Sequence, residues 1–391
     1  MSSLAVRTPE PTIATPTPAR SIIYLGMDVH KDSITIAVLP AEAKAPTRLE
    51  RLPNDLPKLK KWIARVARDG EIRACYEASG AGYVLHRALR EWGYACEVIA
   101  PSLTPKRPGV QRKHDKRDAT DLARYYRAGE LVVVRIPSEA EERVRDVVRC
   151  RETFQREILK SRHYILKFLA RRGFVYREGT NWCTPHLKWL QHLTTDGSPL
   201  APDDRLVFRE YHALLEYKLQ RREELDRKIE QLALLPSLAP MVQTLQCFRG
   251  ISLHSAMVLA TEIGDWRRFE HPRQLACYLG LVPKEDSSGD RIRLGAITKA
   301  GNTHCRHVLV QASWSYRHRP QTSVDLKRRQ AGQPPAVITH AMKAQHRLHA
   351  RFNHLSYRKR SQIAVVAVAR ELVGFLWAVM QDVVIPEPQS V

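Results

Sequence analysis

Cysteine is scarce in this chain of 391 residues, and its few copies follow no recognisable pattern. The seven cysteines form no C-x-x-C pair and are odd in number, which speaks against both a zinc ribbon and a disulfide framework. Scattered cysteines of this kind are typical of reduced thiols in a cytosolic protein.

Long hydrophobic runs are also missing. The most apolar stretch, residues 363–369, is far shorter than the ~20 residues that cross a bilayer, and the charged pair Arg370-Glu371 follows it. The Pro/Thr-rich stretch 8–20 lacks the apolar segment of a signal peptide, so residues 1–20 are expected to form a disordered leader. We therefore expect no membrane partner.

Positive charge is what the chain has in excess. It carries 63 Lys and Arg against 41 Asp and Glu, which gives a formal net charge of +22. Such an excess indicates a nucleic-acid or anionic-surface partner, although it does not specify a fold. Hydrophobic residues make up 43% of the chain, and its length allows two or three domains around substantial cores.

Two carboxylates stand three residues apart inside the basic run 112–119. Asp115 and Asp118 would share one face of a helix, where their mutual repulsion is relieved if both donate oxygen ligands to a divalent cation. Asp121 continues the same spacing, so the sequence alone does not select which of these acids act. A solvated, charged helix start is the alternative interpretation.

Two further acids end predicted strands. The apolar run 22–28 ends on Asp28 and the strand 71–77 ends on Glu77, while helices at 56–67 and 83–92 and strands at 34–39 and 96–100 complete an α/β rhythm. Ligands bind at the carboxyl ends of strands in open α/β sheets. An acid at such a position caps a turn, forms an ion pair with a basic side chain, or binds a metal ion. Four acids so placed can hold two cations for phosphoryl transfer. This order of acids resembles the RuvC-like branch of the RNase H fold.

The second half of the chain is expected to be mainly helical. Apolar residues recur at three- and four-residue steps over 141–172 and 206–235, which predicts an antiparallel helical hairpin or an oligomerisation arm. The Trp- and His-containing stretch 181–190 either packs on this arm or stacks on bases. Residues 245–264 have the pattern of a helix-hairpin-helix, with Ser252 in place of the usual second glycine, or of a purely structural helix pair.

A Ser-Ser-Gly sequence at 287–289 follows a proline and precedes several cations. Such a segment is either an ordinary polar turn or an exposed nucleophile beside phosphate ligands. The His-rich stretch 317–380 contains no cysteine, so it predicts a basic nucleic-acid surface rather than a zinc site. Its end, 363–379, is expected to be a closing core helix.

Taken together, these motifs resemble the DEDD transposases of the insertion-sequence one-ten and eleven-eleven group, the bridge-RNA-guided recombinases. The segments that carry the resemblance span nearly the whole chain and include 26–31, 76–80, 113–119, 280–283, 287–289 and 298–302. Residues 182–190 and 364–377 favour the eleven-eleven branch.

The resemblance implies a site and its chemistry. Mg²⁺ would be held by Asp28, Glu77, Asp115 and Asp118, and Ser288, which directly precedes Gly289, would attack the phosphodiester and remain joined to DNA, with Ser287 as the alternative nucleophile. The residues expected to bind nucleic acid are Lys113, Arg117, Arg291, Arg293 and Lys299. The implied partners are donor and target DNA, a guide RNA, and further copies of this chain in a dimer or tetramer.

We therefore expect an α/β plus α protein in the bacterial cytoplasm, associated with the nucleoid. Its expected parts are a RuvC-like domain (21–140), a helical arm (141–238), a transposase domain with the serine loop (239–325), and a basic segment with the closing helix and tail (326–391). Two other functions remain open. One is a RuvC-like junction nuclease that uses water, and the other is a non-enzymatic nucleic-acid-binding protein.

Overall fold

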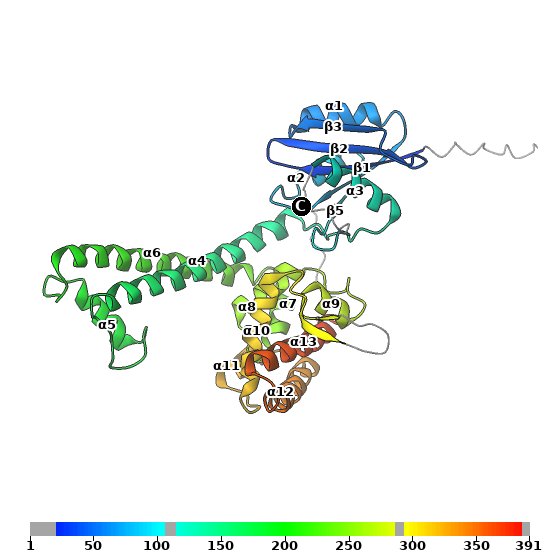
Figure 1. Cartoon of the computed structure of the whole chain (residues 1–391). Coiled ribbons are helices and arrows are strands. Elements are labelled where there is room, and N and C mark those ends of the chain that lie inside the picture. Colours follow the sequence, from blue (N-terminus) through cyan, green and yellow to red (C-terminus); the bar gives the residue numbers. More distant parts are fainter. Residues whose placement is uncertain (1–20, 106–114, 286–292, 385–391) are drawn as a thin grey trace, which may run out of the picture. The chain divides into compact units, whose positions relative to one another are not determined.

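A five-stranded mixed sheet forms the first of two units, residues 1–136 and 137–391, of the computed structural model (Figure 1). The structure describes residues 21–105, 115–285 and 293–384. The strand order is β3-β2-β1-β4-β5, in which β1 runs antiparallel to β2 and parallel to β4. The strands are β1 (Ile22–Val29), β2 (Ser33–Pro40), β3 (Arg48–Pro53), β4 (Glu71–Glu77) and β5 (Ala95–Ile99).

One face of this sheet is covered by α1 (Leu56–Val66) and α2 (Val84–Glu91). Their apolar residues recur at helical spacing and pack on alternate residues of the strands, so that Trp62 and Ile63 belong to the same buried cluster as Met27 and Tyr76. Asp55 caps α1 by accepting a hydrogen bond from the Lys58 amide at 2.9 Å. This face is the core of the first unit.

Helix α3 (Asp115–Ala128) packs on the opposite face, close to the central strand. A Cβ atom added to Gly26 of β1 would stand 2.2 Å from the carbonyl oxygen of Ala119 and 2.4 Å from the amide nitrogen of Ala123. Only a residue without a side chain allows this approach. Gly26 therefore sets how closely α3, with Asp115 at its start, lies to the sheet.

Replacing Gly26 by alanine is expected to destabilise the protein by about 1–3 kcal/mol, because the new methyl group overlaps the backbone of α3. Thermal unfolding of the purified variant measures the effect. Gly80→Ala is the matched control, since nothing lies within 4 Å of an added Cβ there, and it should change stability by less than ~0.5 kcal/mol. Equal melting temperatures for both variants would contradict the close packing of α3.

The edge strand β3 is absent from the sequence-based prediction. Its sequence, Arg-Leu-Glu-Arg-Leu-Pro, carries three charges in six residues and resembles a polar loop. Its pairing with β2 is set by the register Thr35↔Arg51 and Ile36↔Glu50, and the Glu50 carboxylate accepts a hydrogen bond from the Trp62 indole at 2.8 Å. Charged edge strands are common because they discourage pairing with other chains.

The second unit begins with an antiparallel helical hairpin, α4 (Glu139–Ala170) and α6 (Pro202–Leu232), with the short helix α5 (Thr184–Leu193) between them (Figure 1). Ion pairs fix its direction: Arg151 meets Asp226 at 2.7 Å near one end, and Arg172 meets Asp204 at 2.5 Å near the other. The structure therefore has two long antiparallel helices in the region where the sequence predicts a helical hairpin or an oligomerisation arm. The role of the hairpin in oligomerisation stays a prediction.

Residues 181–190, the Trp- and His-containing stretch, form a small aromatic cluster around α5. His186 is fully buried and lies 5.2 Å from Trp182 and 5.6 Å from Trp189, measured between ring centroids. Its Nδ1 accepts a hydrogen bond from the Trp182 amide at 2.8 Å. These rings pack on the hairpin, which was one of the two roles expected for them.

The remaining elements form one large helical core with a two-stranded hairpin. They are α7 (Ala239–Gln246), α8 (Leu253–Ile263), α9 (Pro272–Tyr278), β6 (Pro283–Glu285), β7 (Leu294–Ile297), α10 (Thr303–Ser313), the 3-10 turn Trp314–Arg317, α11 (Val324–Gln330), α12 (Pro335–Ser356) and α13 (Ser361–Met380). In the part of the chain that the structure describes, α13 alone is long and apolar enough to cross a membrane. Half of that apolar stretch is buried here, as in the core helix of many soluble proteins.

Candidate active site

Asp28 and Asp115, which are 87 residues apart in sequence, lie together at the carboxyl end of the central strand. Asp28 follows Met27 on β1, and its side chain is only 16% exposed. Asp115 is the first residue of α3, which packs over Gly26. Alternation along β1 places Gly26 and Asp28 on the same face, so the helix that covers Gly26 brings its own carboxylate to Asp28.

His30 is the third member of this group, and the sequence analysis did not place it among the site residues. Its Nε2 atom lies 3.2 Å from Oδ2 of Asp28 and 3.6 Å from Oδ1 of Asp115. One ligand atom from each of the three residues lies within 4.8 Å of the others. The sequence contains one indication of this: His30 follows Asp28 by two residues, and in an extended chain such side chains point to the same side.

Glu77 and Asp118 are not members of this group of three. Glu77 ends β4, and the parallel register Met27↔Tyr76 places it beside Asp28 on the neighbouring strand end. Asp118 is half-buried and lies one helical turn after Asp115. The structure thus brings two of the four expected acids, Asp28 and Asp115, into one close group.

The donor set of this group fits a divalent cation. Carboxylate oxygens suit Mg²⁺ and Mn²⁺, and a neutral imidazole can add a nitrogen ligand. Arg117 is exposed on α3, two residues after Asp115, where it can meet a bound polyanion. Lys113 lies outside the described residues.

The predicted nucleophile Ser288, its alternative Ser287, and the cation Arg291 also lie outside the described residues. The strands β6 and β7 on either side of that segment are described, and Arg293 is exposed directly before β7. Lys299 is exposed after β7 and has a φ of 56°, which is uncommon for a residue with a side chain. Such backbone strain is frequent at functional sites.

Two segments that flank the β6–β7 hairpin, residues 278–282 and 298–302, are joined by backbone hydrogen bonds, and we call them the hairpin base. The Lys299 amide donates to the Gly280 carbonyl at 3.1 Å, and the Thr298 amide donates to the Val282 carbonyl at 2.9 Å. A Cβ atom on Gly301 would stand 2.0 Å from the Tyr278 carbonyl oxygen, so this turn requires glycine. The hairpin base therefore has a defined backbone conformation.

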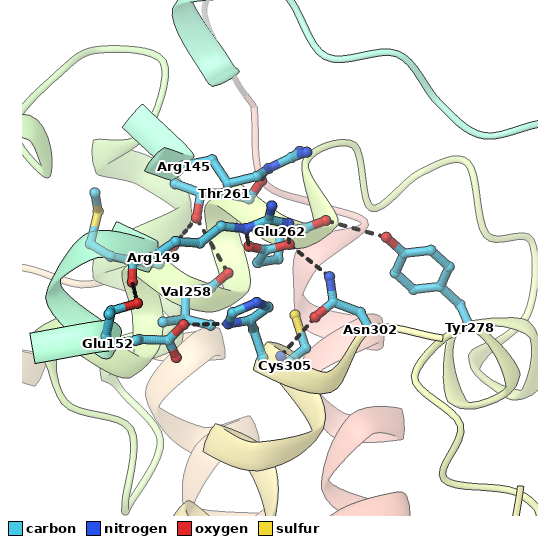
Figure 2. Close-up of polar contacts among 12 residues, drawn as sticks. Arg145, Arg149, Glu152, Val258, Thr261, Glu262, Tyr278, Asn302 and Cys305 are labelled. Atoms are coloured by element: carbon cyan, nitrogen blue, oxygen red, sulfur yellow. Dashed lines mark hydrogen bonds and ion pairs between the residues drawn. The ribbon is translucent and has the colours of Figure 1, made fainter. Parts of the chain in front are cut away.

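A buried carboxylate ties the hairpin base to α4 (Figure 2). The Glu262 side chain is 2% exposed and accepts hydrogen bonds from Arg149 Nε at 2.6 Å and Nη2 at 2.9 Å, and from Asn302 Nδ2 at 2.7 Å. Burial pushes the pKa of Glu262 up, but the hydrogen bonds and charge of Arg149 outweigh it, so the pKa lies below its ordinary value. Asn302 also caps α10 by accepting from the Cys305 amide.

Arg149→Met is expected to destabilise the protein by about 3 kcal/mol at neutral pH, because it leaves a buried carboxylate without its cation. In the wild type the pKa of Glu262 is lowered, so the stability from this pair is present above the ordinary glutamate pKa and is lost as the pH falls through the folded-state value. In the variant, burial raises that pKa. The difference between the two proteins should therefore shrink towards about pH 4.

Urea denaturation at both pH values measures this difference. Arg143→Met is the matched control on the same helix, because Arg143 and its partner Glu139 are both largely exposed, and it should cost less than ~1 kcal/mol. A pH-independent loss in Arg149→Met would contradict the role of the Glu262 charge.

Comparison with known proteins places the chain among transposases. A model for a DEDD transposase matches residues 25–172, and a model described as the transposase IS116/IS110/IS902 family matches residues 242–326. The chain is 37% identical over 364 residues to a putative transposase, y4qE, of Sinorhizobium fredii, covering 92% of this chain and 88% of the relative. It is 30% identical over 346 residues to the transposase for insertion sequence element IS1533 of Leptospira borgpetersenii, covering 86% and 98%.

These matches, with a mixed sheet that carries acids at its strand ends, define the protein as a transposase, an enzyme that cuts and rejoins DNA. DNA is accordingly its substrate. The chain belongs to the IS116/IS110/IS902 family of transposases. It is also 22% identical over 313 residues to the transposase for insertion sequence element IS1111A of Coxiella burnetii, covering 79% of this chain and 81% of the relative. The family resemblance inferred from the sequence is confirmed, and a non-enzymatic binding protein is ruled out.

Proposed function

We propose that this transposase joins DNA strands with a divalent metal site and a serine nucleophile. Asp28, Glu77, Asp115 and Asp118 would hold the metal, for which the resemblance implies Mg²⁺. When bound, the metal supplies a positive charge that polarises the scissile phosphate. The observation that supports this most is the meeting of Asp28 with Asp115 from two separate elements.

The serine would carry the covalent part of the reaction. The Ser288 hydroxyl oxygen forms a new ester bond to phosphorus while one bridging P–O bond of the DNA breaks, and the released oxygen leaves as a hydroxyl group. Arg291, Arg293 and Lys299 would balance phosphate charge around this step. The joined backbone of the hairpin base supports the proposal, because it gives the serine segment a defined attachment.

We further propose a guide RNA and an oligomer of this chain as partners, in the cytoplasm of a bacterium and in contact with its nucleoid. The net charge of +22 supports contact with more than one polyanion. The arm of α4 and α6 is the element best suited to join protomers, because a long hairpin presents an extended surface.

Removing divalent metal should abolish cleavage and leave DNA binding in place, because backbone contacts come from Lys and Arg. The measurement is strand cleavage of the element's terminal DNA with Mg²⁺, with EDTA, and with Mg²⁺ restored. Cleavage that persists in EDTA would contradict the metal site. Cleavage that needs metal but leaves no protein on the DNA ends would favour the junction nuclease that uses water.

A further inference from the structure

The imidazole of His30 occupies a place between two carboxylates that hydrogen bonding alone does not explain. Its Nε2 atom is 3.2 Å from Asp28 and 3.6 Å from Asp115. One nitrogen carries at most one proton, so it can donate to only one of these oxygens, and 3.6 Å exceeds a hydrogen bond. The three ligand atoms instead surround a common point, since all lie within 4.8 Å of one another.

These separations match the edges of a metal coordination shell. Neighbouring ligands at right angles, each about 2.1 Å from a cation, stand roughly 3 Å apart. The two distances from His30 need to close by only a few tenths of an ångström to reach that spacing. Small side-chain rotations are sufficient for such a change.

The turn that carries His30 is held in place from two sides. The His30 amide donates to the Ser33 carbonyl at 2.9 Å within the β1–β2 turn. Asn54 directly follows β3. Its Nδ2 atom donates hydrogen bonds to the carbonyl oxygens of His30 at 2.9 Å and Lys31 at 3.3 Å. The imidazole therefore extends from a fixed backbone, as a metal ligand requires.

The negative charge of the two carboxylates also favours binding of a cation. Among the residues that the structure describes, neither Asp28 nor Asp115 forms an ion pair with Lys or Arg, and the side chain within 4 Å of both is the imidazole of His30. Asp28 is mostly buried, so its charge is poorly solvated. A bound divalent ion would neutralise both carboxylates while leaving the imidazole neutral and free to donate its electron pair.

We propose that His30 is a metal ligand together with Asp28 and Asp115, and that it makes this site bind Mn²⁺ more tightly than Mg²⁺. The inference rests on the metal site of the proposed function and adds a nitrogen ligand to it. Mg²⁺ strongly prefers oxygen ligands and gives up water reluctantly, whereas transition metals accept imidazole readily. His30 thus determines which divalent ion the site prefers.

Pulsed electron paramagnetic resonance of the full chain loaded with Mn²⁺ tests this directly. A coordinated imidazole nitrogen gives a ¹⁴N modulation of the Mn²⁺ signal, which we expect in the wild type and in Lys31→Ala, and which should vanish in His30→Ala. Titration calorimetry should show a roughly tenfold or larger loss of Mn²⁺ affinity in His30→Ala, and a smaller change for Mg²⁺. Circular dichroism of each variant verifies the fold.

The outcomes separate this inference from the proposal beneath it. Mn²⁺ that binds the wild type without ¹⁴N modulation, and that is lost in Asp28→Ala, would overturn the role of His30 and keep the carboxylate site. Modulation that persists in His30→Ala would assign the nitrogen to another of the sixteen histidines and likewise overturn the inference. Absence of any bound Mn²⁺ would overturn both.

Discussion

Asp28→Ala should abolish strand cleavage and recombination, a loss of at least about 10³-fold, in a protein that still folds and binds DNA. Asp28 lies in one close group with His30 and Asp115, so its removal takes a carboxylate away from that group. The same loss is expected for Glu77→Ala, Asp115→Ala and Asp118→Ala. DNA affinity should hold or rise, because each change makes the site less negative.

Asp121→Ala is the matched control, and it should leave activity close to the wild-type level. Successive helical residues are turned by about 100°, which places Asp121 on α3 well away from the face that buries Ala119 and Ala123 against the sheet. Recombination of a donor and a target plasmid, scored for each variant, gives the comparison. Full activity in Asp118→Ala would contradict the metal-site assignment.

Ser288→Ala should eliminate the covalent link between protein and DNA, with no detectable adduct where the wild type forms one. Ser288 precedes Gly289, whose missing side chain allows a phosphate to approach the backbone. Arg293, directly before β7, and Lys299, shortly after it, are both exposed and can balance the negative charge of that phosphate.

The adduct is detected by incubating labelled DNA with protein and Mg²⁺, denaturing, and following label that migrates with protein. Ser287→Ala is the control one residue away and should keep the adduct. Loss of the adduct only in Ser287→Ala would move the nucleophile back by one residue. Undiminished strand exchange in the double variant would contradict a serine mechanism of any kind.

Much of the first unit could be predicted from local patterns. The run that ends on Asp28 is apolar because β1 is a central strand buried on both faces, and such runs are recognisable without a partner. The i, i+3 spacing of Asp115 and Asp118 correctly places both on one helix. The spacing alone could not show which of the two acids lies beside Asp28, because that depends on how α3 is rotated against the sheet.

Other features depend on contacts that no local pattern contains. The position of His30 depends on a turn held by Asn54, which is 24 residues further along the chain. The buried pair of Arg149 and Glu262 joins helices 113 residues apart, and a single arginine on a charged helix gives no sign of it. Such long-range polar contacts become visible only once the elements are packed.

The covalent adduct in the Asp28→Ala variant is the measurement that tests the central claim most directly, because the account requires the acids and the serine to act in one reaction. Labelled DNA is incubated with Mg²⁺ and either wild type or variant, and mass spectrometry locates any nucleotide attached to the digested protein. The account predicts a nucleotide on the peptide that contains Ser288 in the wild type, and none in the variant although its serine is intact. Adduct formation at the wild-type level in Asp28→Ala would contradict it.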